Sequence, residues 1–595
     1  MSISLCMIVK NEEENLKRCL ESVKDIVDEM IIVDTGSKDS TVPIAKLFGA
    51  KVYDFLWTGD FSEARNHSLK FATGDWILLM DADDELEKED REKVLELTHE
   101  NSAEAYFFRT ISFVDSAEGY DEMQNLNIRL IRNKKGYFFS NPIHEQIYMN
   151  IKKITPQAKI LNKDIRVYHY GYLNKNIVHQ DKRNRNIEIL NKELESNPGY
   201  SFALFNLGNE YFAKTEYLKA IEYYERAYYK FDPVQGFSSK LILKMANCFM
   251  YLGKNEDALA KIAEGLKHYP KFTDLIFIRA LIYHFQNKLT LAIESLKTCI
   301  QMGESPIDLN ILLGSGTYRS HFLLAEILYD FEDFDGAVEN YNMSLKYNHK
   351  EFAVRKLLKS LCKKKLGQKQ LEEQLEKLNE YHIEIPNELL CDIFFQEKYY
   401  DLALKYVGRI EKESSALFLQ GMCKLMLKKY KSACLVMKTL EEDNKFCAKA
   451  LCMQALCKIL SKNYKQAENL LSSKGVNPED KMIQTYNAFK SIMKTGEVMV
   501  LCEDENGSTA YTDIIFELLR ILLLLNEIEI FEKALLLLNT VTDKTVLLRL
   551  AKLYYSEGHY KLAFDEFMRS IKIFDLIDTE GANMLYKLKR LGIDS

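Results

Sequence analysis

Alanine recurs at nearly regular intervals through the C-terminal two thirds of the chain, within apolar patterns typical of helices. The recurring positions are Ala220, Ala258, Ala292, Ala337, Ala403, Ala433, Ala467, Ala534 and Ala563. The interval is 34 residues from Ala258 to Ala292 and again from Ala433 to Ala467. In such repeats small residues let the two helices of a hairpin approach, and hairpins stack because none buries its apolar face alone. We therefore expect an all-helical solenoid over residues 199–595.

The first of these units is similar to a tetratricopeptide repeat. The residues that follow its spacing are Leu204, Leu207, Gly208, Tyr211, Ala220, Tyr224, Ala227 and, one place late, Pro233. The last clear unit lies at residues 547–567, and the segments Gly303–Thr317 and Glu503–Thr509 interrupt the regular spacing. We expect about nine to eleven units, some of them degenerate.

The first hundred residues alternate between short apolar runs, typical of strands, and amphipathic stretches. The runs are Ile3–Val9, Met30–Asp34, Lys51–Phe55 and Trp76–Met80, and the stretches that follow them are Glu13–Val23, Thr41–Phe48, Glu63–Ala72 and Lys88–Leu97. This rhythm predicts a parallel sheet with helices on both faces. Four later strands, expected at Ala105–Val114, Asn127–Arg132, Tyr137–Ser140 and Ile165–Tyr172, predict a mixed or antiparallel second half. We divide the chain into an α/β domain at residues 1–175, a helical linker at 176–198 and the solenoid at 199–595.

The composition narrows the classes of function. With 595 residues, 47 % of them hydrophobic, the chain is expected to fold throughout and into more than one domain. A formal net charge of −7 gives no global field that attracts nucleic acid or an anionic membrane. The sequence shows no secretory signal pattern, no uncharged span of membrane length and no CxxC pair among its 12 cysteines. These features favour a soluble, cytoplasmic protein with free thiols, and homo-oligomerisation stays open.

Asp34 closes the second expected strand, within the segment Val33-Asp34-Thr35-Gly36-Ser37. In open α/β sheets, ligands bind at the carboxyl ends of the strands, and an acid at the end of the second strand can contact a nucleoside. Gly36 lets the turn come close to such a ligand. The alternative is a simple strand-to-helix turn in which Ser40 or Asp39 caps the next helix.

Asp81 and Asp83 directly follow the apolar run Trp76–Met80. Alternation places the two carboxylates on one side of a strand end, where they suit Mg²⁺ or Mn²⁺ bound together with substrate phosphates. The alternative is an acidic loop in which Asp83 or Asp84 caps the next helix. An acid-ended second strand at this distance upstream favours the metal site.

Four segments in this order resemble the family-two glycosyltransferases of the GT-A fold. They are Met7–Glu13, Ile32–Ser37, Asp60–Asn66 and Asp81–Asp83. The resemblance covers about the first 175 residues and implies an α/β GT-A catalytic domain, with a Rossmann-like mixed sheet, ahead of the all-α tetratricopeptide-repeat solenoid. Within that family, this combination looks like the sublancin-type peptide S-glycosyltransferases and the related enzymes that glycosylate flagellin.

The resemblance also implies roles for individual residues. Asp34 would contact the uracil or ribose of a UDP-sugar, and Asp83, at the end of the DxD motif, would bind Mn²⁺ or Mg²⁺, with Asp81 and His169 as further metal ligands. The other residues expected at the donor are Lys10, Asn11, Glu12, Arg65, Asn66, Asp81 and Ala82. For Arg65 the alternative is a surface ion pair, and for His169 a satisfied imidazole at a strand end.

An inverting transfer needs a base that takes the proton from the acceptor. By the same resemblance Glu145 is the candidate, although the chain reads His144-Glu145 where many relatives have Glu-Asp. His144 is the alternative base or a phosphate ligand, and a structural imidazole is a third interpretation of it.

These features together predict an inverting, metal-dependent enzyme that moves a hexose or N-acetylhexosamine from a UDP-sugar to a polypeptide side chain held by the repeats. The acceptor atom, in Ser, Thr or Cys, stays open. No Gln-x-x-Arg-Trp motif is present and the only tryptophans are Trp57 and Trp76, so processive polysaccharide synthases are disfavoured. The alternatives are a transferase for lipid-linked or lipopolysaccharide sugars and a non-catalytic repeat scaffold.

Overall fold

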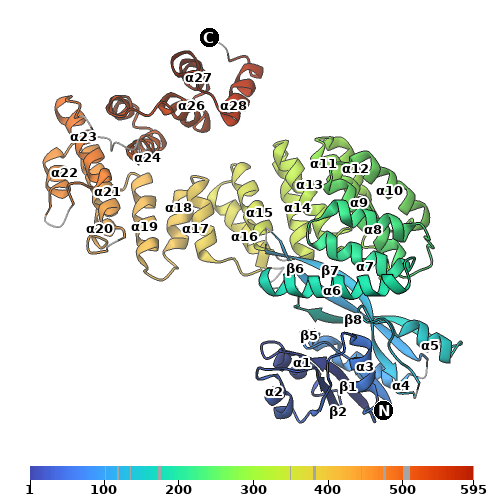
Figure 1. Ribbon diagram of the computed structural model, residues 1–595. Helices are drawn as coiled ribbons and strands as arrows, with labels where there is room; N and C mark the ends of the chain where they lie inside the picture. The colour runs from blue at the N-terminus through green and yellow to red at the C-terminus, as the bar shows by residue number, and fades with distance from the viewer. Residues whose placement is uncertain are drawn as a thin grey trace. The chain divides into compact units, whose positions relative to one another are not determined.

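The computed structural model of the protein describes most of the chain (Figure 1). Residues 101, 117–118, 135, 172–175, 349, 380–382, 444, 474–476, 500, 502–509 and 594–595 lie outside the described part, as do the side chains of 114–116, 119–121, 176–181 and 379. The chain forms two compact units, Met1–Leu357 and Leu358–Ser595. The first unit contains the whole sheet together with the first helical hairpins.

An eight-stranded sheet forms the core of the N-terminal domain, in the order β3-β2-β1-β4-β7-β6-β8-β5. Its strands are β1 (Ile3–Val9), β2 (Glu29–Asp34), β3 (Lys51–Asp54), β4 (Trp76–Leu79), β5 (Asp84–Leu86), β6 (Ala105–Ser116), β7 (Gly119–Arg132) and β8 (Ile160–His169). Strands β1 to β4 pair in parallel, whereas β7 is antiparallel to both β4 and β6. The predicted mixed sheet, parallel first and then largely antiparallel, is confirmed.

Helices cover both faces of this sheet, as expected. They are α1 (Leu16–Val23), α2 (Thr41–Leu47), α3 (Phe61–Leu69), α4 (Arg91–His99) and α5 (Tyr148–Ile154), with a 3-10 turn at Lys88–Asp90. Alternate residues of β1 define the two layers: Leu5 packs with Leu20 of α1 on one face, and Cys6 packs with Ile151 of α5 on the other. Because both faces are buried, the strands read as nearly continuous apolar runs.

One predicted strand is wrong. Residues Tyr137–Ser140 form no strand, and Ser140 makes only an isolated bridge with Gln146. The side-chain amide of Asn66 pairs instead with the Phe139 backbone, which donates to Asn66 Oδ1 at 2.7 Å and accepts from Nδ2 at 2.9 Å. A side chain therefore takes the place of a strand partner here. Tyr172, at the end of the last expected strand, lies outside the described residues.

The rest of the described chain is helical. The first unit contains α6 (Asn176–Ser196), α7 (Ser201–Ala213), α8 (Tyr217–Tyr228), α9 (Ser238–Tyr251), α10 (Asn255–His268), α11 (Thr273–Phe285), α12 (Leu289–Met302), α13 (Tyr318–Asp330) and α14 (Phe334–Tyr347), and α15 (Glu351–Lys363) crosses into the second. The second unit contains α16 (Gln368–Asn379), α17 (Asn387–Gln396), α18 (Tyr400–Val407), α19 (Ser414–Met426), α20 (Tyr430–Lys438), α21 (Cys447–Leu460), α22 (Tyr464–Leu471), α23 (Lys481–Thr495), α24 (Ala510–Leu524), α25 (Ile528–Ala534), a 3-10 segment (Leu535–Thr540), α26 (Val546–Ser556), α27 (Tyr560–Phe574) and α28 (Thr579–Arg590). No helix among these described residues has the length and apolar character needed to cross a membrane.

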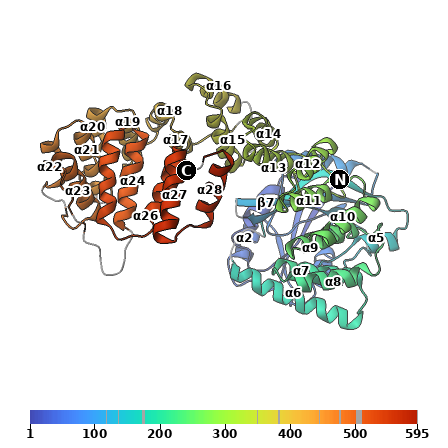
Figure 2. The same cartoon turned by 90° about the horizontal axis from the view of Figure 1, so that it is seen from above.

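Successive helices pair as hairpins, for example α7 with α8 and α26 with α27 (Figures 1 and 2). Every alanine of the predicted repeat lies on the second helix of such a pair and is at most 1 % exposed. Gly208 shows why small residues are needed at the seam, since a Cβ there would overlap the ring of Tyr224 on α8. The predicted repeat solenoid is confirmed. The polar break Glu503–Thr509 lies outside the described residues.

Eight of the nine hairpin turns have a left-handed residue five positions before the repeat alanine; in the turn before Ala534 the left-handed residue is Asn526, eight positions before it. These eight residues are Thr215, Gly253, Asn287, Glu332, Lys398, Lys428, Lys462 and Gly558, with φ between 56° and 83°. Glycine adopts this conformation without the Cβ clash that other residues meet. The turn keeps the same left-handed conformation even where this position is a lysine and not a glycine.

Replacing Lys462 by glycine is expected to stabilise the second unit. Lys462 has φ 57°, its side chain is exposed, and glycine relieves the strain, so the free energy of unfolding should rise by about 0.5–1 kcal/mol. Urea unfolding followed by circular dichroism measures this change. Lys465→Gly, inside α22, is the matched control and is expected to lower stability by about 1 kcal/mol. Equal effects of the two variants would contradict this account.

The insertion at Gly303–Thr317 docks against strand β7 within the first unit. The Gln124 backbone N–H donates to the Ile311 carbonyl at 2.8 Å, and Met123 bridges to Leu312. Asp274 of α11 fixes this loop by accepting from the backbone N–H groups of Ile311 (2.9 Å) and Leu312 (2.7 Å). The interruption in the repeat spacing is therefore a contact between the repeats and the sheet.

Candidate active site

The candidate site lies where the parallel strands β1, β2 and β4 end. The loops after β1 and β2 are tied together, because the Asn11 N–H donates to Ser37 Oγ (3.0 Å) and the Lys38 N–H donates to Asn11 Oδ1 (2.8 Å). Asn11 has φ 54°, which turns the chain sharply after β1. Lys10 is exposed beside this turn. The expected donor residues after β1 therefore lie at the carboxyl edge of the sheet.

Asp34 is engaged by its own turn. Its carboxylate accepts from the Ser37 hydroxyl (2.5 Å) and the Ser37 N–H (3.0 Å), and the residue is only 6 % exposed. Gly36, with φ 104°, permits this turn. Asp39 accepts from the Thr41 N–H at the start of α2, as the alternative of a capped strand-to-helix turn expects, and Asp34 adds its own hydrogen bonds to that turn.

Asp81 lies between two arginines. Arg65 of α3 donates to one carboxylate oxygen at 2.5 Å, and Arg129 of β7 donates to the other at 3.3 Å. Burial favours the neutral acid, but the two guanidinium charges outweigh it and hold the pKa of Asp81 well below its usual range. The two arginines therefore favour the ionised form of Asp81, and each of them binds one of its carboxylate oxygens.

Arg129 is a site residue that the sequence analysis missed. The register of β6 and β7 passes from the pair Tyr106–Leu130 to the pair Phe107–Ile128, so Arg129 is the extra residue of a bulge. Bulges of this kind redirect a side chain and occur often beside active sites. Arg129 is 4 % exposed and also pairs with Asp84 at 2.9 Å. An arginine inside an apolar strand was the available signal, because buried arginines are almost always paired.

Asp83, Asp84 and His169 form a cluster of metal-ligating side chains. Each offers one ligand atom, and these atoms lie within 4.8 Å of one another. His169 Nδ1 lies 3.0 Å from Asp84 Oδ1 and 3.4 Å from Asp83 Oδ1. The Asp84 side chain is fully buried and also accepts from the Asp81 N–H at 2.8 Å. Asp84 therefore orients His169 through the ring nitrogen Nδ1, in the way that a carboxylate usually supports a metal-ligating histidine.

Gly171 shows that Asp83 and His169 converge on one place. A Cβ on Gly171 would overlap Asp83 Oδ2 and lie 2.8 Å from His169 Nε2. Both atoms therefore border the same small space, on the side of the imidazole away from Asp84. An oxygen and a nitrogen placed in this way match the ligand preferences of Mn²⁺ and Mg²⁺, which take carboxylate oxygens, with imidazole also suiting transition metals.

The pKa values of Asp83 and His169 are both raised, so the folded cluster favours the binding of protons. Burial, with help from the charges of Asp84, Asp81 and Glu12 and against that of His169, raises the pKa of Asp83 to about 6. Burial opposes the charged form of His169, but the hydrogen bond with Asp84 and the charge of Asp83 outweigh it and raise the pKa of His169 to about 9. Closely placed carboxylates of this kind are stabilised by a cation.

Glu145 joins the cluster through Arg65, whose Nε donates to Glu145 Oε1 at 2.5 Å. Arg65 is thus a bridge between Asp81 and Glu145, with its side chain only 15 % exposed, and not the exposed surface pair considered above. His144 lies elsewhere in this loop: its Nε2 is buried and has no hydrogen-bond partner among the residues that the structure describes, and burial lowers the pKa of His144. The structure brings Glu145, but not His144, to the acidic cluster.

Two further expected donor residues have structural contacts. Asn66 holds the Phe139 backbone, as described above, and Ala82 is buried between the two aspartates at 4 % exposure. Glu12 receives a hydrogen bond from Asn15 (3.0 Å), and its charge acts on Asp83. Of these three, Glu12 alone contributes charge to the cluster.

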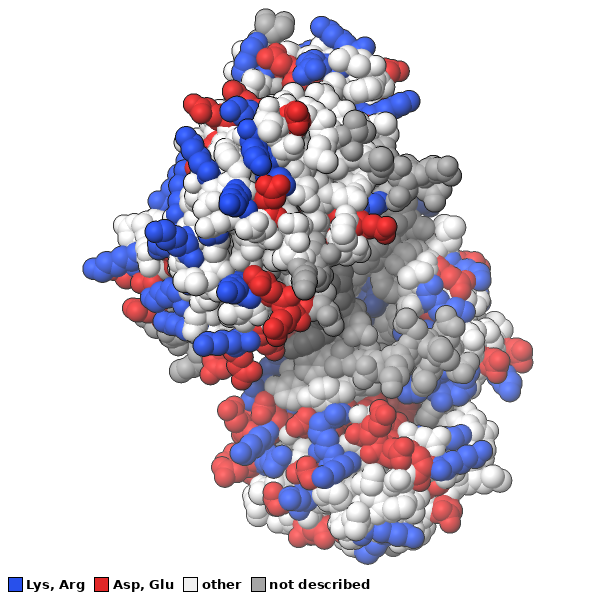
Figure 3. All heavy atoms as spheres, turned by 90° about the vertical axis from the view of Figure 1, so that its left-hand side faces the viewer, with Lys and Arg blue, Asp and Glu red and all other residues white. Residues whose placement is uncertain are grey.

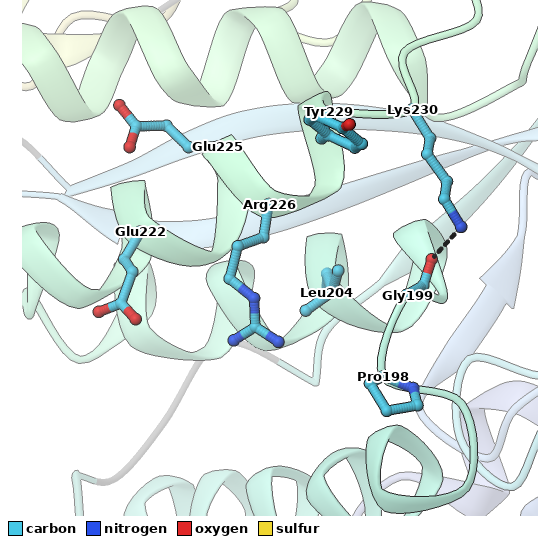
Figure 4. A pocket seen from close by; sticks show the side chains of 8 residues that line it. All are labelled: Pro198, Gly199, Leu204, Glu222, Glu225, Arg226, Tyr229 and Lys230. Carbon is cyan, nitrogen blue, oxygen red and sulfur yellow. Dashed lines mark hydrogen bonds between the residues drawn. The ribbon is translucent and has the colours of Figure 1, made fainter.

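A pocket of about 470 Å³ lies away from this cluster, on the first hairpin of the repeats. It lies between the start of α7 and the end of α8, where Lys230 donates to the Gly199 carbonyl at 3.5 Å (Figure 4). Its charged lining is mixed, with Glu222 and Glu225 beside Arg226 and Lys230. It has neither the metal-ligating set nor the single sign of charge that would attract a nucleotide.

Comparison with known proteins agrees with the geometry. Residues 4–160 match the family described as Glycosyl transferase family 2. The SPbeta prophage-derived glycosyltransferase SunS of Bacillus subtilis is 31 % identical over 302 residues, which are 49 % of this chain and 69 % of SunS. A TPR repeat-containing protein of Synechococcus elongatus is 37 % identical over 210 residues, and the chain covers about half of its length, 51 %.

Among solved structures, S. aureus TarS 1–349 in complex with UDP-GlcNAc is 16 % identical to this chain, with a TM-score of 0.25. The match covers 50 % of this chain and 92 % of the TarS chain. The two curated relatives are named for the two parts of the expected combination, a glycosyltransferase and a TPR repeat-containing protein, and more than two thirds of SunS is matched. Both the expected family and the expected combination with tetratricopeptide repeats are thereby confirmed. The chain belongs to glycosyl transferase family 2.

Proposed function

We propose that the protein is an inverting, metal-dependent glycosyltransferase that uses a UDP-sugar, a hexose or an N-acetylhexosamine, and glycosylates a polypeptide side chain. The observation that supports this most directly is the convergence of Asp83 and His169 at the strand ends, beside the Asp81–Arg65–Glu145 bridge. Oxygen and nitrogen ligands next to fixed arginines suit the diphosphate of a nucleotide sugar.

The residues present fit a divalent cation. Asp83 and His169 would hold it, Asp84 would orient His169, and Asp81 would act through the arginines and not as a direct ligand. When bound, Mn²⁺ or Mg²⁺ would neutralise charge on the leaving diphosphate. Arg65 and Arg129 are held in place by Asp81, so their positive charge is fixed before substrate binds and costs no reorganisation during the reaction.

In the proposed transfer, the acceptor oxygen or sulfur forms a bond to the anomeric carbon while the bond from that carbon to the diphosphate breaks. Glu145 takes the acceptor proton, and UDP leaves with the electron pair of the broken bond. Arg65 orients the Glu145 carboxylate through their 2.5 Å hydrogen bond. A Cys acceptor, with a reference pKa of about 8.5, needs less help from this base than Ser or Thr.

The polypeptide acceptor is proposed from the repeats. Stacked helical hairpins present long surfaces that suit an extended peptide. In the first unit the insertion at Gly303–Thr317 fixes the repeats to strand β7, which also carries Arg129 of the site. An acceptor held by these repeats is therefore held against the strand that leads to the acidic cluster.

The experiment is incubation of the full chain with UDP-glucose, UDP-galactose or UDP-GlcNAc, Mn²⁺ and a peptide extract, followed by intact mass measurement. A mass increase of one hexose or N-acetylhexosamine on peptides, abolished by EDTA, is expected. Sugar found only on lipid would replace this proposal by the lipid-linked transferase. That alternative favours a basic surface, whereas Lys and Arg are interspersed with Asp and Glu on the face shown in Figure 3. UDP-sugar affinity unaffected by EDTA and by Asp83→Ala would instead support a non-catalytic scaffold.

Glu145→Gln is expected to lower the transfer rate by about 10²-fold, because the carboxylate that accepts the proton is lost. UDP affinity in the presence of Mn²⁺ should stay within about twofold, since Asp83 and His169 are unchanged. His144→Gln is the control, expected to reduce transfer far less because its Nε2 is buried away from the cluster. A larger loss in the His144 variant would assign the base to His144.

A further inference from the structure

Two lysines on helix α9 form no ion pair with any carboxylate of the described residues. Lys240 and Lys244 are one helical turn apart and half-buried. Lys240 Nζ donates to Asn125 Oδ1 of β7 at 2.8 Å, and Lys244 Nζ lies 4.3 Å from the centre of the Phe212 ring on α7. Within the described part of the chain neither ammonium forms an ion pair, although acidic residues outnumber basic ones in the sequence, 87 to 80.

Such a pair is costly to the folded protein. Removal from water lowers the pKa of both Lys240 and Lys244 to about 8, and the charge of Lys244 lowers the pKa of Lys240 further. A half-buried charge without a carboxylate partner is unfavourable for the folded state, and groups perturbed in this way are often found at functional sites. The pair therefore has the character of a binding site for an anion.

A row of polar side chains connects these lysines with the acidic cluster. Asn125, which accepts from Lys240, pairs in register with Thr110 of β6. The Thr110 hydroxyl in turn accepts from Asn127 Nδ2 (3.1 Å) and from Arg129 (3.5 Å), and Arg129 contacts Asp81 and Asp84. The lysines and the candidate active site thus lie along the same face of strand β7.

The spacing along this strand suits a short stretch of peptide. Arg129 lies four positions after Asn125, which is roughly 13 Å in an extended strand. An extended acceptor peptide covers that distance in about four residues. Asn247, about one turn beyond Lys244 on α9, has a buried Oδ1 that accepts no hydrogen bond from the described residues.

We propose that Lys240 and Lys244 bind a carboxylate of the acceptor polypeptide, an Asp or Glu side chain about four residues from the residue that receives the sugar. The inference rests on the proposed function for the identity of the acceptor. Charge complementarity selects the ligand: a repeat surface with two unpaired ammonium groups discriminates against basic peptides and in favour of acidic ones.

The test uses the full chain with UDP and Mn²⁺ and a library of random short peptides displayed on phage. Three proteins are compared: wild type, K240Q/K244Q, and the control K267Q/K271Q, which removes two exposed lysines with the same spacing from the same unit. Sequencing of the selected peptides gives the frequency of Asp and Glu relative to the starting library. Thermal melting shows that K240Q/K244Q folds, and its Tm is expected to equal or exceed that of wild type because buried unpaired charges are removed.

Wild type and K267Q/K271Q are expected to enrich Asp and Glu by at least about threefold, and K240Q/K244Q to show no enrichment. Absence of enrichment in wild type, or enrichment kept by K240Q/K244Q, overturns the proposal, as does enrichment of phosphopeptides alone in a second, phosphorylated library. UDP binding in the presence of Mn²⁺, measured by calorimetry, is expected to be equal in all three proteins. Failure of wild type to bind UDP would refute the proposed function. The peptide enrichment would still test whether Lys240 and Lys244 bind a carboxylate.

Discussion

Replacing Asp83 by asparagine is expected to reduce sugar transfer by about 10³-fold, while the fold is kept. Asp83 Oδ2 and His169 Nε2 border the same space beside Gly171, so the variant removes one of the two groups that would hold the cation. The amide also removes the negative charge that attracts a divalent ion. Transfer measured with saturating UDP-sugar and Mn²⁺ gives the size of the loss.

A readout independent of activity comes from thermal melting. Burial and the neighbouring Asp84, Asp81 and Glu12 disfavour the Asp83 carboxylate, so asparagine should not lower the Tm of the metal-free protein. Mn²⁺ should raise the Tm of wild type and not that of the variant, because only a cation bound to the folded state stabilises it. Asp25→Asn, at an acid 67 % exposed in the same domain, is the control. A variant with full activity, or with the same Mn²⁺-dependent Tm rise, would refute the site.

The sequence was sufficient for the parts of the fold that depend on periodicity. Buried parallel strands read as apolar runs, so β1 was predicted with the bounds observed, Ile3–Val9. The repeat alanines were all found in buried hairpin seams, because a larger residue there meets the facing helix. Such patterns follow from the periodicity of helices and strands, which is visible in the spacing of apolar residues.

Features that depend on distant contacts were not accessible in the same way. The loop around Phe139 reads as a strand but is held by Asn66, 73 residues earlier in the sequence. Arg129 reaches Asp81 and Asp84 only because a bulge interrupts the register of β6 and β7. Neither an amide that replaces a strand partner nor the position of a bulge is marked by hydrophobic pattern.

The candidate site shows the same division. The order of motifs indicated that Asp81, Asp83, Arg65 and Glu145 belong together, and the structure places them in one network. The sequence did not show which aspartate is available to bind a cation, because that depends on its neighbours in the fold. Asp81 is hydrogen-bonded to two arginines, whereas Asp83 lies beside His169. Family motifs therefore identify which residues form a site, and the contacts in the folded structure decide which role each of them can have.

Gly171→Ala is expected to impair transfer about as strongly as the Asp83 variant, by about 10³-fold, without removing any ligand. A methyl group at this position would overlap Asp83 Oδ2 and lie 2.8 Å from His169 Nε2, so it would fill the space on which both converge. Asp83 is held by its own backbone, whose carbonyl accepts from the Tyr170 N–H at 3.0 Å, and this contact limits how far it can move away.

The decisive comparison is a double-mutant cycle. Gly171→Ala and Asp83→Asn should each abolish the Mn²⁺-dependent rise in Tm, and the double variant should be no less active than either single one, because both act on the same site. Gly236→Ala is the matched control: no atom lies within 4 Å of the Cβ that it adds, and its φ is not positive, so activity should be unchanged. If the losses of the two site variants multiply, Gly171 does not act through Asp83. In that case the space beside His169 belongs to another ligand, and the cation site must be sought among the other acids at the strand ends.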